Sequence, residues 1–273
     1  MLTETQKQRY LRNTLLQEIT ESGQEKLLRA KVLVIGAGGL GSPVLLYLAA
    51  AGVGNIGVMD DDVVELSNLQ RQVIHSFSNL GQKKVISARE KILALNEDVN
   101  LTIYDQRANH DSLSVIAMHY DYILDATDNF PTRFIINEVC HKLRKPLIFA
   151  AVKGFLGQVS VFKSYENSIE SCDKSVAKIQ KSSLDTNSAL TTNPCYACFN
   201  TNIVDENFSL PLSEKGILGA VAGTIGALQA TTTIREILQI GESLVGKILV
   251  FDFLKNEFRK VALKKNSTCQ VCR

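Results

Sequence analysis

The sequence has 273 residues, of which 45% are hydrophobic and 21% charged, and its formal net charge is +2. This length allows one or two domains with a sizeable core, and the interspersed charges indicate neither a nucleic-acid nor an anionic-membrane partner. The sequence shows no secretory signal, and its most apolar stretch, 217–228, is too short to span a bilayer. Six cysteines, four of them in two C-x-x-C pairs, favour a reducing compartment, so we expect a cytoplasmic protein.

The first thirty residues predict two helices. Apolar residues recur at helical spacing from Glu4 to Glu18, with Arg12 beside them, and this spacing favours a solvated basic face on a docking helix. Ser22, followed by Glu25 three residues later, predicts a capping box at the start of a second, short helix.

The stretch 31–41, KVLVIGAGGLG, carries the strongest motif. Its apolar, β-branched run predicts a buried strand, and a G-x-G-x-x-G turn follows it and opens a helix over 42–52. Such a turn lets the backbone approach a pyrophosphate, while the helix N-terminus offers free N–H groups. The next strand, 56–59, delivers Asp60 where a ribose-binding acid is expected, so we predict a nucleotide site. The glycines of the turn are Gly36, Gly38, Gly39 and Gly41, and two further acids, Asp61 and Asp62, follow Asp60.

A polar segment, 65–73, follows these acids without any periodicity. It places Asn68, Arg71 and Gln72 close together just past the end of a strand. Ligands of open parallel sheets bind at the carboxyl ends of the strands, so this segment is a candidate site. A hydrogen-bonded surface loop is the alternative.

Two further places carry charged residues of interest. A helix predicted over 81–95 begins with Lys83 and Lys84, and cations at a helix N-terminus are unfavourable unless an anion lies nearby. Another predicted strand ends in DATDN, where Asp125 suits a cap or turn and Asp128 is the candidate metal ligand.

Strands alternate with helices along most of the chain, which predicts a Rossmann-like, doubly wound and mainly parallel sheet. The strand over 158–163 alternates in polarity and predicts an antiparallel edge. A long helix over 216–240 and a hairpin of 247–253 and 258–263 close the chain. The other predicted elements are strands over 101–104, 122–124 and 146–152 and helices over 112–117 and 130–143.

The two C-x-x-C pairs predict a tetrahedral four-thiolate zinc site of structural type that ties the C-terminal tail to the body. Disulfides or free thiols are the alternative. Cys140 has apolar neighbours and suits a core thiol, whereas the polar segment 164–194, with Cys172, predicts a mobile loop. The zinc ligands would be Cys195, Cys198, Cys269 and Cys272.

Taken in order, these motifs resemble the ThiF/MoeB/HesA family of adenylyltransferases, which are related to the adenylation domain of ubiquitin-activating enzymes. The resemblance covers nearly the whole chain. It rests on RYLR at 9–12, the glycine turn, DDD at 60–62 followed by LSNLQRQ, GQKK at 81–84, DATDN at 125–129 and the two C-x-x-C pairs.

The resemblance implies ATP as a substrate, with its ribose held by Asp60 and Mg²⁺ held by Asp128. It also implies a homodimer in which Arg12 reaches the phosphates of the neighbouring protomer, so Arg12 is then more than a solvated cation. Arg12, Asn68, Arg71, Lys84 and Asp128 would be catalytic. The nucleotide would be bound by Gly36, Gly38, Gly39, Gly41, Asp60, Asp62, Asn68, Arg71, Gln72, Lys84, Asp128 and Asn129.

The implied reaction is adenylation of the C-terminal Gly-Gly carboxylate of a ubiquitin-like sulfur-carrier protein, with release of pyrophosphate. DDD at 60–62 and KGFLG at 153–157 favour a ThiS-like carrier of thiamine biosynthesis, and a MoaD-like carrier of molybdopterin synthesis is the alternative. Leu212 stands where some relatives have a cysteine, which puts covalent chemistry in doubt there. No rhodanese domain follows the last cysteines, so we expect a separate sulfur donor protein.

Two other functions compete with this one. The glycine turn and Asp60 would serve an NAD-dependent oxidoreductase equally well, but that function leaves segment 66–72, Lys84 and the cysteines unexplained. A scaffold protein without catalysis would not need the charged residues Arg12, Arg71, Lys84 and Asp128 together. We therefore expect one adenylation domain over 1–273, with N-terminal helices (1–30), a nucleotide-binding core (31–163), a mobile loop (164–194) and a zinc-tied, carrier-binding portion (195–273).

Overall fold

The computed structural model describes residues 1–166, 192–200 and 216–273. Within these residues one eight-stranded sheet runs in the order β3-β2-β1-β4-β5-β6-β7-β8. The pairs from β3 to β5 are parallel and the pairs from β5 to β8 are antiparallel, as expected for a doubly wound sheet with a late antiparallel portion. The strands are β1 (Lys31–Ile35), β2 (Asn55–Met59), β3 (Asn100–Tyr104), β4 (Tyr122–Asp125), β5 (Leu147–Lys153), β6 (Leu156–Phe162), β7 (Lys247–Asp252) and β8 (Glu257–Ala262).

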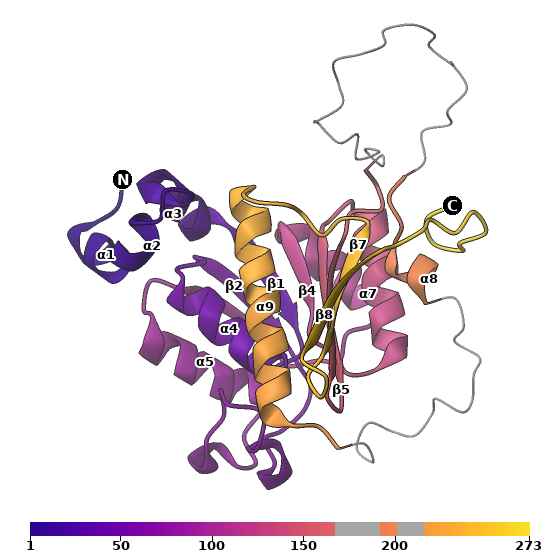
Figure 1. Cartoon of the computed structure of the whole chain (residues 1–273). Coiled ribbons are helices and arrows are strands. Elements are labelled where there is room, and N and C mark those ends of the chain that lie inside the picture. The colour runs from indigo at the N-terminus through magenta and orange to yellow at the C-terminus, as the bar shows by residue number, and fades with distance from the viewer. Residues whose placement is uncertain (167–191, 201–215) are drawn as a thin grey trace, which may run out of the picture.

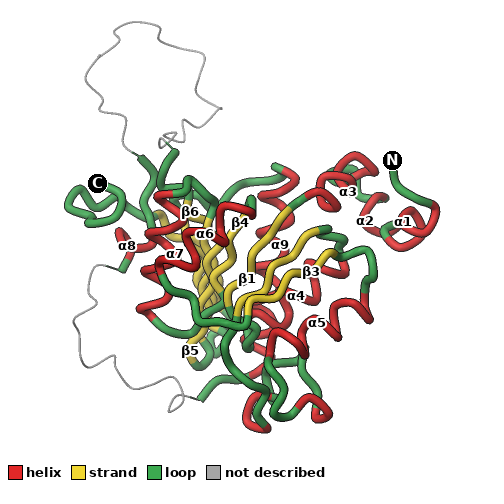
Figure 2. Tube along the Cα trace, turned by 180° about the vertical axis from the view of Figure 1, so that it is seen from behind, coloured by secondary structure: helices red, strands yellow, loops and turns green. Residues whose placement is uncertain are grey.

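Helices cover both faces of the sheet (Figures 1 and 2). On one face α4 packs between α5 and α9, and α9 also contacts β5 and β6; on the other face α7 packs on β4 and β5 beside α6 and α8. The helices of the body are α4 (Gly41–Ala50), α5 (Lys84–Leu95), α6 (His110–Ile116), α7 (Phe130–Lys142), α8 (Tyr196–Phe199) and α9 (Gly219–Leu238). Three helices precede the sheet, α1 (Glu4–Arg9), α2 (Leu11–Thr14) and α3 (Thr20–Arg29), and short 3-10 turns lie at Leu66–Asn68, Phe77–Asn79 and Ala117–His119.

The sequence of β1 explains why the sheet is buried on both faces. Successive side chains of a strand point to opposite faces. Val32 and Val34 accordingly belong to the core that includes α4 and α9, whereas Leu33 and Ile35 belong to the core that includes α7. Burial of each such side chain stabilises the fold by about 1.5–3 kcal/mol. The two cores hold β1 rigidly, and the glycine turn starts at its end.

The N-terminal helices differ from the sequence prediction. The single helix expected over Glu4–Glu18 is interrupted at Tyr10, whose side chain is 1% exposed and hydrogen-bonded to Asn96 and Asp98. Burial of this ring decides the path of the backbone against local helical propensity. The capping box predicted at Ser22 is absent, because α3 already begins at Thr20 and places Ser22 inside the helix.

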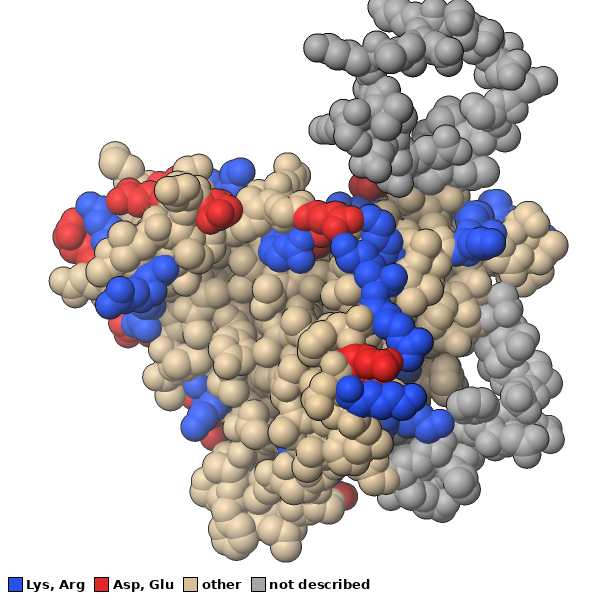
Figure 3. All heavy atoms as spheres, viewed as in Figure 1, with Lys and Arg blue, Asp and Glu red and all other residues tan. Residues whose placement is uncertain are grey.

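Two boundaries in the body also differ. Helix α5 starts at Lys84 instead of 81, since Gly81 has φ +79° and therefore lies outside the helix. Strand β6 is antiparallel as predicted but is not an edge, because β7 pairs with its free side. The edge on this side of the sheet is β8, which is exposed along its whole length, and basic side chains gather on the face around β7 and β8 (Figure 3). The hairpin of β7 and β8 is confirmed, with Asn256 at φ +55° in its turn.

Some predictions fall on residues that the structure does not describe. Most of the segment 164–194 lies outside the described residues, as do Cys172 and Leu212. At its two described ends, Ser164 and Asn193 are buried, and the Asn193 amide donates to the Glu166 carbonyl at 2.9 Å. None of the described helices is long and apolar enough to cross a membrane.

Candidate active site

A pocket of about 390 Å³ opens at the carboxyl ends of the parallel strands. It lies where the strand order reverses, because the chain builds β2 and β3 on one side of β1 and then β4 and β5 on the other. Crevices at such reversals are where open α/β sheets bind ligands. The polar and charged residues of its lining are Asp60, Asp61, Asp62, Arg71, Gln72, Lys84, Gln106, Arg107, Thr127, Asp128, Asn129, Thr132 and Arg133.

The four glycines of the turn have different surroundings. A Cβ atom on Gly36, which has φ +101°, would lie 2.7 Å from the Ala126 carbonyl oxygen, and one on Gly41 would lie 1.9 Å from the Gly36 carbonyl oxygen. These two glycines are required by the fold itself. Gly38 and Gly39 face the pocket and have no atom closer than 3.4 Å to such a Cβ. A ligand can therefore approach the backbone at Gly38 and Gly39.

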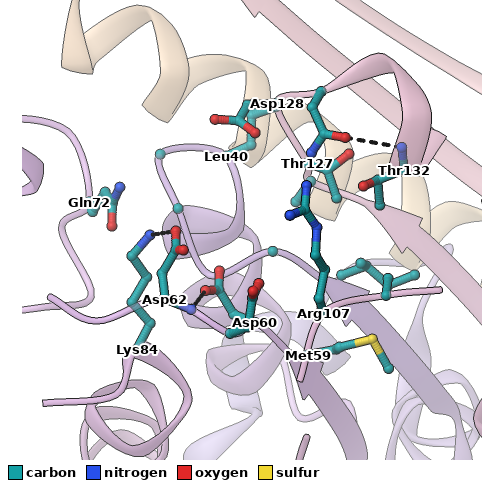
Figure 4. Close-up of a pocket in the computed structure, with 18 of the residues that line it drawn as sticks. Leu40, Met59, Asp60, Asp62, Gln72, Lys84, Arg107, Thr127, Asp128 and Thr132 are labelled. Atoms are coloured by element: carbon teal, nitrogen blue, oxygen red, sulfur yellow. Dashed lines mark hydrogen bonds and ion pairs between the residues drawn. The ribbon is translucent and has the colours of Figure 1, made fainter. Parts of the chain in front are cut away.

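Asp60 is fixed at the end of β2 by two backbone hydrogen bonds. The Ala37 amide donates to Oδ2 at 2.7 Å. The Asp62 amide donates to Oδ1 at 2.9 Å, as Figure 4 shows. Burial raises the pKa of this carboxyl, although Lys84 and the two amides act in the opposite direction. Asp60 thus stands beside the glycine turn with its carboxylate oxygens oriented, as a ribose-binding acid must.

Lys84 and Arg71 bring positive charge to the pocket from two other segments. Lys84 is 5% exposed, and its ammonium donates to the Asp62 carboxylate at 2.7 Å (Figure 4). Arg71 anchors one guanidinium nitrogen on the Ser67 carbonyl at 3.0 Å and lies against Gly39. Gln72 lies beside it in the lining. The structure thus brings the predicted cations to the glycine turn.

The turn between β4 and α7 carries Asp128 and Asn129 into the same pocket. Asn129 caps α7, since its Oδ1 accepts from the Thr132 amide at 3.0 Å (Figure 4). Asp125 is 1% exposed and accepts the Thr127 amide at 2.9 Å and the Thr127 hydroxyl at 2.6 Å. Asp125 therefore has the structural role expected of it, while Asp128 is exposed in the pocket.

Three of the predicted residues do not line the pocket of their own chain. Gly41 is inside the first turn of α4. Asn68 is 7% exposed, and its Oδ1 accepts the Glu65 amide at 3.1 Å, so its side chain stabilises the turn that carries Arg71. Arg12 is exposed on α2, beside the far end of α4.

Two cations of the lining were not predicted as site residues. Arg107 follows β3, and its side chain extends into the pocket between Asp60 and Thr127 (Figure 4). Arg133 lies one turn into α7. The position of Arg107 just past a strand end is the signal that singled out Asn68 and Asp128, so the same rule could have found it. Arg133 gives no such signal, because its helical position lies beyond the turn.

The surroundings of His75 indicate a packing role and not proton transfer. Its ring is 7% exposed, with Nε2 3.0 Å from the Ala37 carbonyl and Nδ1 2.9 Å from the Ser87 hydroxyl. Burial lowers the pKa of His75, with Lys84 acting in the same direction. The ring thus packs against the glycine turn through the Ala37 carbonyl.

The four cysteines of the C-x-x-C pairs form a buried cluster. Their sulfurs lie within 4.8 Å of one another, with Cys195 3.6 Å from Cys269 and Cys198 3.4 Å from Cys272. Zn–S bonds of about 2.3 Å in a tetrahedron would place the sulfurs about 3.8 Å apart. The donor set and spacing fit a zinc ion with no open coordination position. Cys140 is buried apart from the cluster, and burial raises the pKa of its thiol.

Comparison with known proteins places this site in a family. A sequence model described as the ThiF family matches residues 10–271. The chain belongs to the ThiF family. The match begins just after α1 and spans α2, α3, the pocket and three of the four cysteines of the C-x-x-C pairs, ending one residue before Cys272.

Relatives of this ThiF-family chain align along nearly its whole length. It is 37% identical over 270 residues to the sulfur carrier protein adenylyltransferase of Thermus thermophilus, covering 99% of this chain and 92% of that protein. It is 35% identical to the SAMP-activating enzyme E1 of Haloferax volcanii, covering 99% and 90%. It is 38% identical to the adenylyltransferase and sulfurtransferase MOCS3 of Culex quinquefasciatus, with 97% of this chain covered and 55% of that longer protein spanned.

Solved structures confirm the fold. The crystal structure of Escherichia coli MccB with ATP superimposes on the ThiF-family chain with a TM-score of 0.75 at 23% identity, covering 97% of this chain and 74% of MccB. The MccB complex with succinimide gives a TM-score of 0.76 at 22% identity. Likeness at this identity concerns the fold alone.

Proposed function

We propose that this protein adenylates the C-terminal Gly-Gly carboxylate of a ubiquitin-like sulfur-carrier protein, using ATP and releasing pyrophosphate. The observation that carries the proposal is the composition of the pocket. One cavity at the strand ends is surrounded by Asp60, the open glycines Gly38 and Gly39, the cations Arg71 and Lys84, and Asp128. The relatives named above supply the reaction type, so the chain is an adenylyltransferase.

The residues of the pocket suit this chemistry without a general base. A terminal carboxyl has a pKa of about 3.5 and is ionised at neutral pH. Its oxygen would form a bond to the α-phosphorus of ATP while the bond from that phosphorus to the pyrophosphate oxygen breaks, and no proton moves. The requirement is to hold two anions together and to neutralise charge on the leaving pyrophosphate. Arg71 and Lys84 stand at the glycine turn and provide that charge.

Asp128 is the residue we propose for Mg²⁺. Mg²⁺ sites in nucleotide enzymes commonly use one or two carboxylates together with phosphate oxygens and water. The exposed carboxylate of Asp128 faces the pocket from the side opposite Asp60 and Asp62 (Figure 4), so it fits such a site. Mg²⁺ bound there would offset the negative charge of the phosphates. For the cysteine cluster we propose a structural zinc ion, which suits a cytoplasmic protein in which the cysteines of the described residues are free of disulfides.

A homodimer would complete the pocket. Arg12 cannot serve its own pocket, because Asn13 next to it contacts Ala51 at the end of α4 that is distant from the glycine turn. Helix α4 has ten residues and is therefore about 15 Å long, which separates Arg12 from the glycine turn of its own chain.

A lobe formed by residues 63–80 also flanks the pocket and exposes large apolar side chains. These side chains are Val63, Leu66, Val73, Phe77 and Leu80. The lower part of the molecule shows little charge in Figure 3. We propose that a second copy covers this lobe and contributes Arg12.

For the carrier we propose a ThiS-like protein first and a MoaD-like protein as the alternative, with sulfur supplied by a separate donor protein. The preference rests on the sequences at 60–62 and 153–157. The division into N-terminal helices, nucleotide core, loop and C-terminal carrier-binding portion stays part of this proposal.

The test is ATP–pyrophosphate exchange with Mg²⁺, run with a ThiS-like and with a MoaD-like carrier. Each carrier is also tested with its last glycine deleted, as a matched control. We expect exchange that requires one carrier and its final glycine. Absence of exchange with both carriers, together with tight binding of NAD and no binding of ATP, would favour an oxidoreductase instead.

A further inference from the structure

Arg133 is a buried cation at the edge of the pocket that the proposed reaction does not use. Arg133 is only 8% exposed. Its guanidinium carbon lies 5.7 Å from the ring centroid of Phe130 and 5.5 Å from that of Phe149. Burying an arginine is costly unless its donors and charge are compensated. The partners of the guanidinium therefore indicate what the residue does.

Two acceptors of this guanidinium belong to the turn that carries Asp128, while the Tyr196 side chain of α8 also interacts with it. Nη2 donates to the Thr127 carbonyl at 2.8 Å, and Nε lies 3.8 Å from the Asp125 carboxylate. Nε has no hydrogen-bond partner among the described residues. One guanidinium thus spans the residues on the N-terminal side of Asp128.

The turn that carries Asp128 is also held by Asp125, by α9 and by the first turn of α7. Asp125 accepts both the amide and the hydroxyl of Thr127, and its own carbonyl accepts the Gln229 amide of α9 at 2.9 Å. On the C-terminal side, Asn129 is fixed as the cap of α7. Asp128 itself has no hydrogen bond or ion pair to a described residue, so the position of its carboxylate depends on these neighbours (Figure 4).

We propose that Arg133 is a positioning residue for Asp128: through Thr127 and Asp125 it holds the turn in the conformation in which the Asp128 carboxylate binds the metal of the metal–ATP complex. This inference rests on the proposed role of Asp128. A guanidinium suits the task because its planar fork can serve two acceptors at fixed directions, which an ammonium cannot. Residues that orient a metal ligand typically change metal affinity by about 10–100-fold when replaced.

The experiment measures the dissociation constant of ATP twice for each variant, once with excess Mg²⁺ and once with EDTA. The ratio of the two constants is the gain in affinity that the metal provides, and no carrier protein is needed. We expect Arg133→Met to lower this gain by about tenfold, over and above the change in affinity for metal-free ATP that follows from removing a cation of the pocket lining. Arg133→Lys should lower it by a smaller factor. Lys142→Met, which removes an exposed cation from the same helix, is the matched control and should leave both constants unchanged.

A second variant separates positioning from stability. Arg133→Met leaves the buried Asp125 carboxylate without a counterion and can destabilise the fold. The double variant Asp125→Asn with Arg133→Met removes both charges, so it should fold yet keep the reduced metal gain. A wild-type gain in the double variant would overturn the inference, as would an equal loss of metal-free and metal-bound ATP affinity. Failure of the proposed function shows separately, as absent carrier-dependent exchange in a wild-type protein that binds ATP.

Discussion

Gly38 and Gly41 sit three residues apart in the same motif but meet different constraints. A Cβ on Gly38 would have Gln72 Nε2 at 3.8 Å as its nearest neighbour, an ordinary contact, whereas a Cβ on Gly41 would collide with the Gly36 carbonyl oxygen at 1.9 Å. We therefore expect Gly38→Ala to fold normally and to weaken ATP binding, because the new methyl group occupies space next to the phosphates. Gly41→Ala should instead lower the thermal midpoint, since backbone must move.

Calorimetric ATP titration and thermal unfolding of both variants separate the two effects. The unliganded stability of Gly38→Ala should stay close to that of the wild type. If Gly38→Ala bound ATP with unchanged affinity, the phosphates would not lie over this part of the turn.

His75 gives a prediction for the dependence of stability on pH. Its pKa in the folded protein lies below the ordinary value of 6.5, mainly because of burial, so the unfolded chain takes up a proton first as the pH falls. The contribution of His75 to the free energy of unfolding is therefore complete above pH 6.5 and decreases as the pH falls through the folded pKa. Gln at this position cannot titrate and can still donate to the Ala37 carbonyl.

We expect the wild type to lose more stability than His75→Gln between pH 7.5 and pH 5.5. Urea unfolding of both proteins at several pH values measures the difference. Parallel pH profiles would show that the ring does not titrate differently in the folded and unfolded states.

At the scale of elements, the cysteine cluster joins α8 to the C-terminal tail. The cluster is buried, and the residues it joins are 74 positions apart. Structural zinc in small domains contributes directly to folding stability. We expect about one zinc per chain, with Cys269→Ser losing the metal and lowering the thermal midpoint. Cys140→Ala is the matched control, because Cys140 is buried outside the cluster and should leave the zinc content unchanged. A full zinc content in Cys269→Ser would contradict the assignment.

The elements that the sequence predicted well are those whose local pattern agrees with their packing. In β1 the apolar run, the glycines that follow and the helix start all support the same structure, so the strand and the site next to it could be predicted. Tyr10 shows the opposite case. Its helical spacing is regular, but the ring is buried against Asn96 and Asp98, and this distant contact breaks the helix.

Contacts between residues distant in the sequence also limited the prediction of the site. Asp60 follows β2 directly and Asp128 lies in the turn just after β4, so the chain position alone places both at the edge of the sheet. Arg133 reaches that edge through its side chain, from a helix, and its contacts with Thr127 and Asp125 cannot be read from its position in the sequence. Likewise β6 could be assigned as antiparallel from its alternation, but β7 arrives from a segment almost ninety residues later and covers its free side.

At the scale of the whole molecule, the position of Arg12 permits a decisive test of the proposed homodimer. Arg12 lies at the amino-terminal end of the sheet, next to α3, while Asp128 lies at the carboxyl ends of the strands. If Arg12 acts across the dimer, each site combines Asp128 of one protomer with Arg12 of the other. Arg12→Ala and Asp128→Ala should then each be inactive as pure dimers.

Mixing the two inactive variants should restore activity. In a mixed dimer the protomer that carries Arg12→Ala keeps its own Asp128 and receives an intact Arg12 from its partner, so one of the two sites is complete. Random reassortment makes about half of the dimers mixed, so carrier-dependent exchange should return to about a quarter of the wild-type value. The two proteins are denatured and refolded together, with each variant refolded alone as the control. If Arg12 served its own protomer, every site would still lack one of the two residues and the mixture would stay inactive.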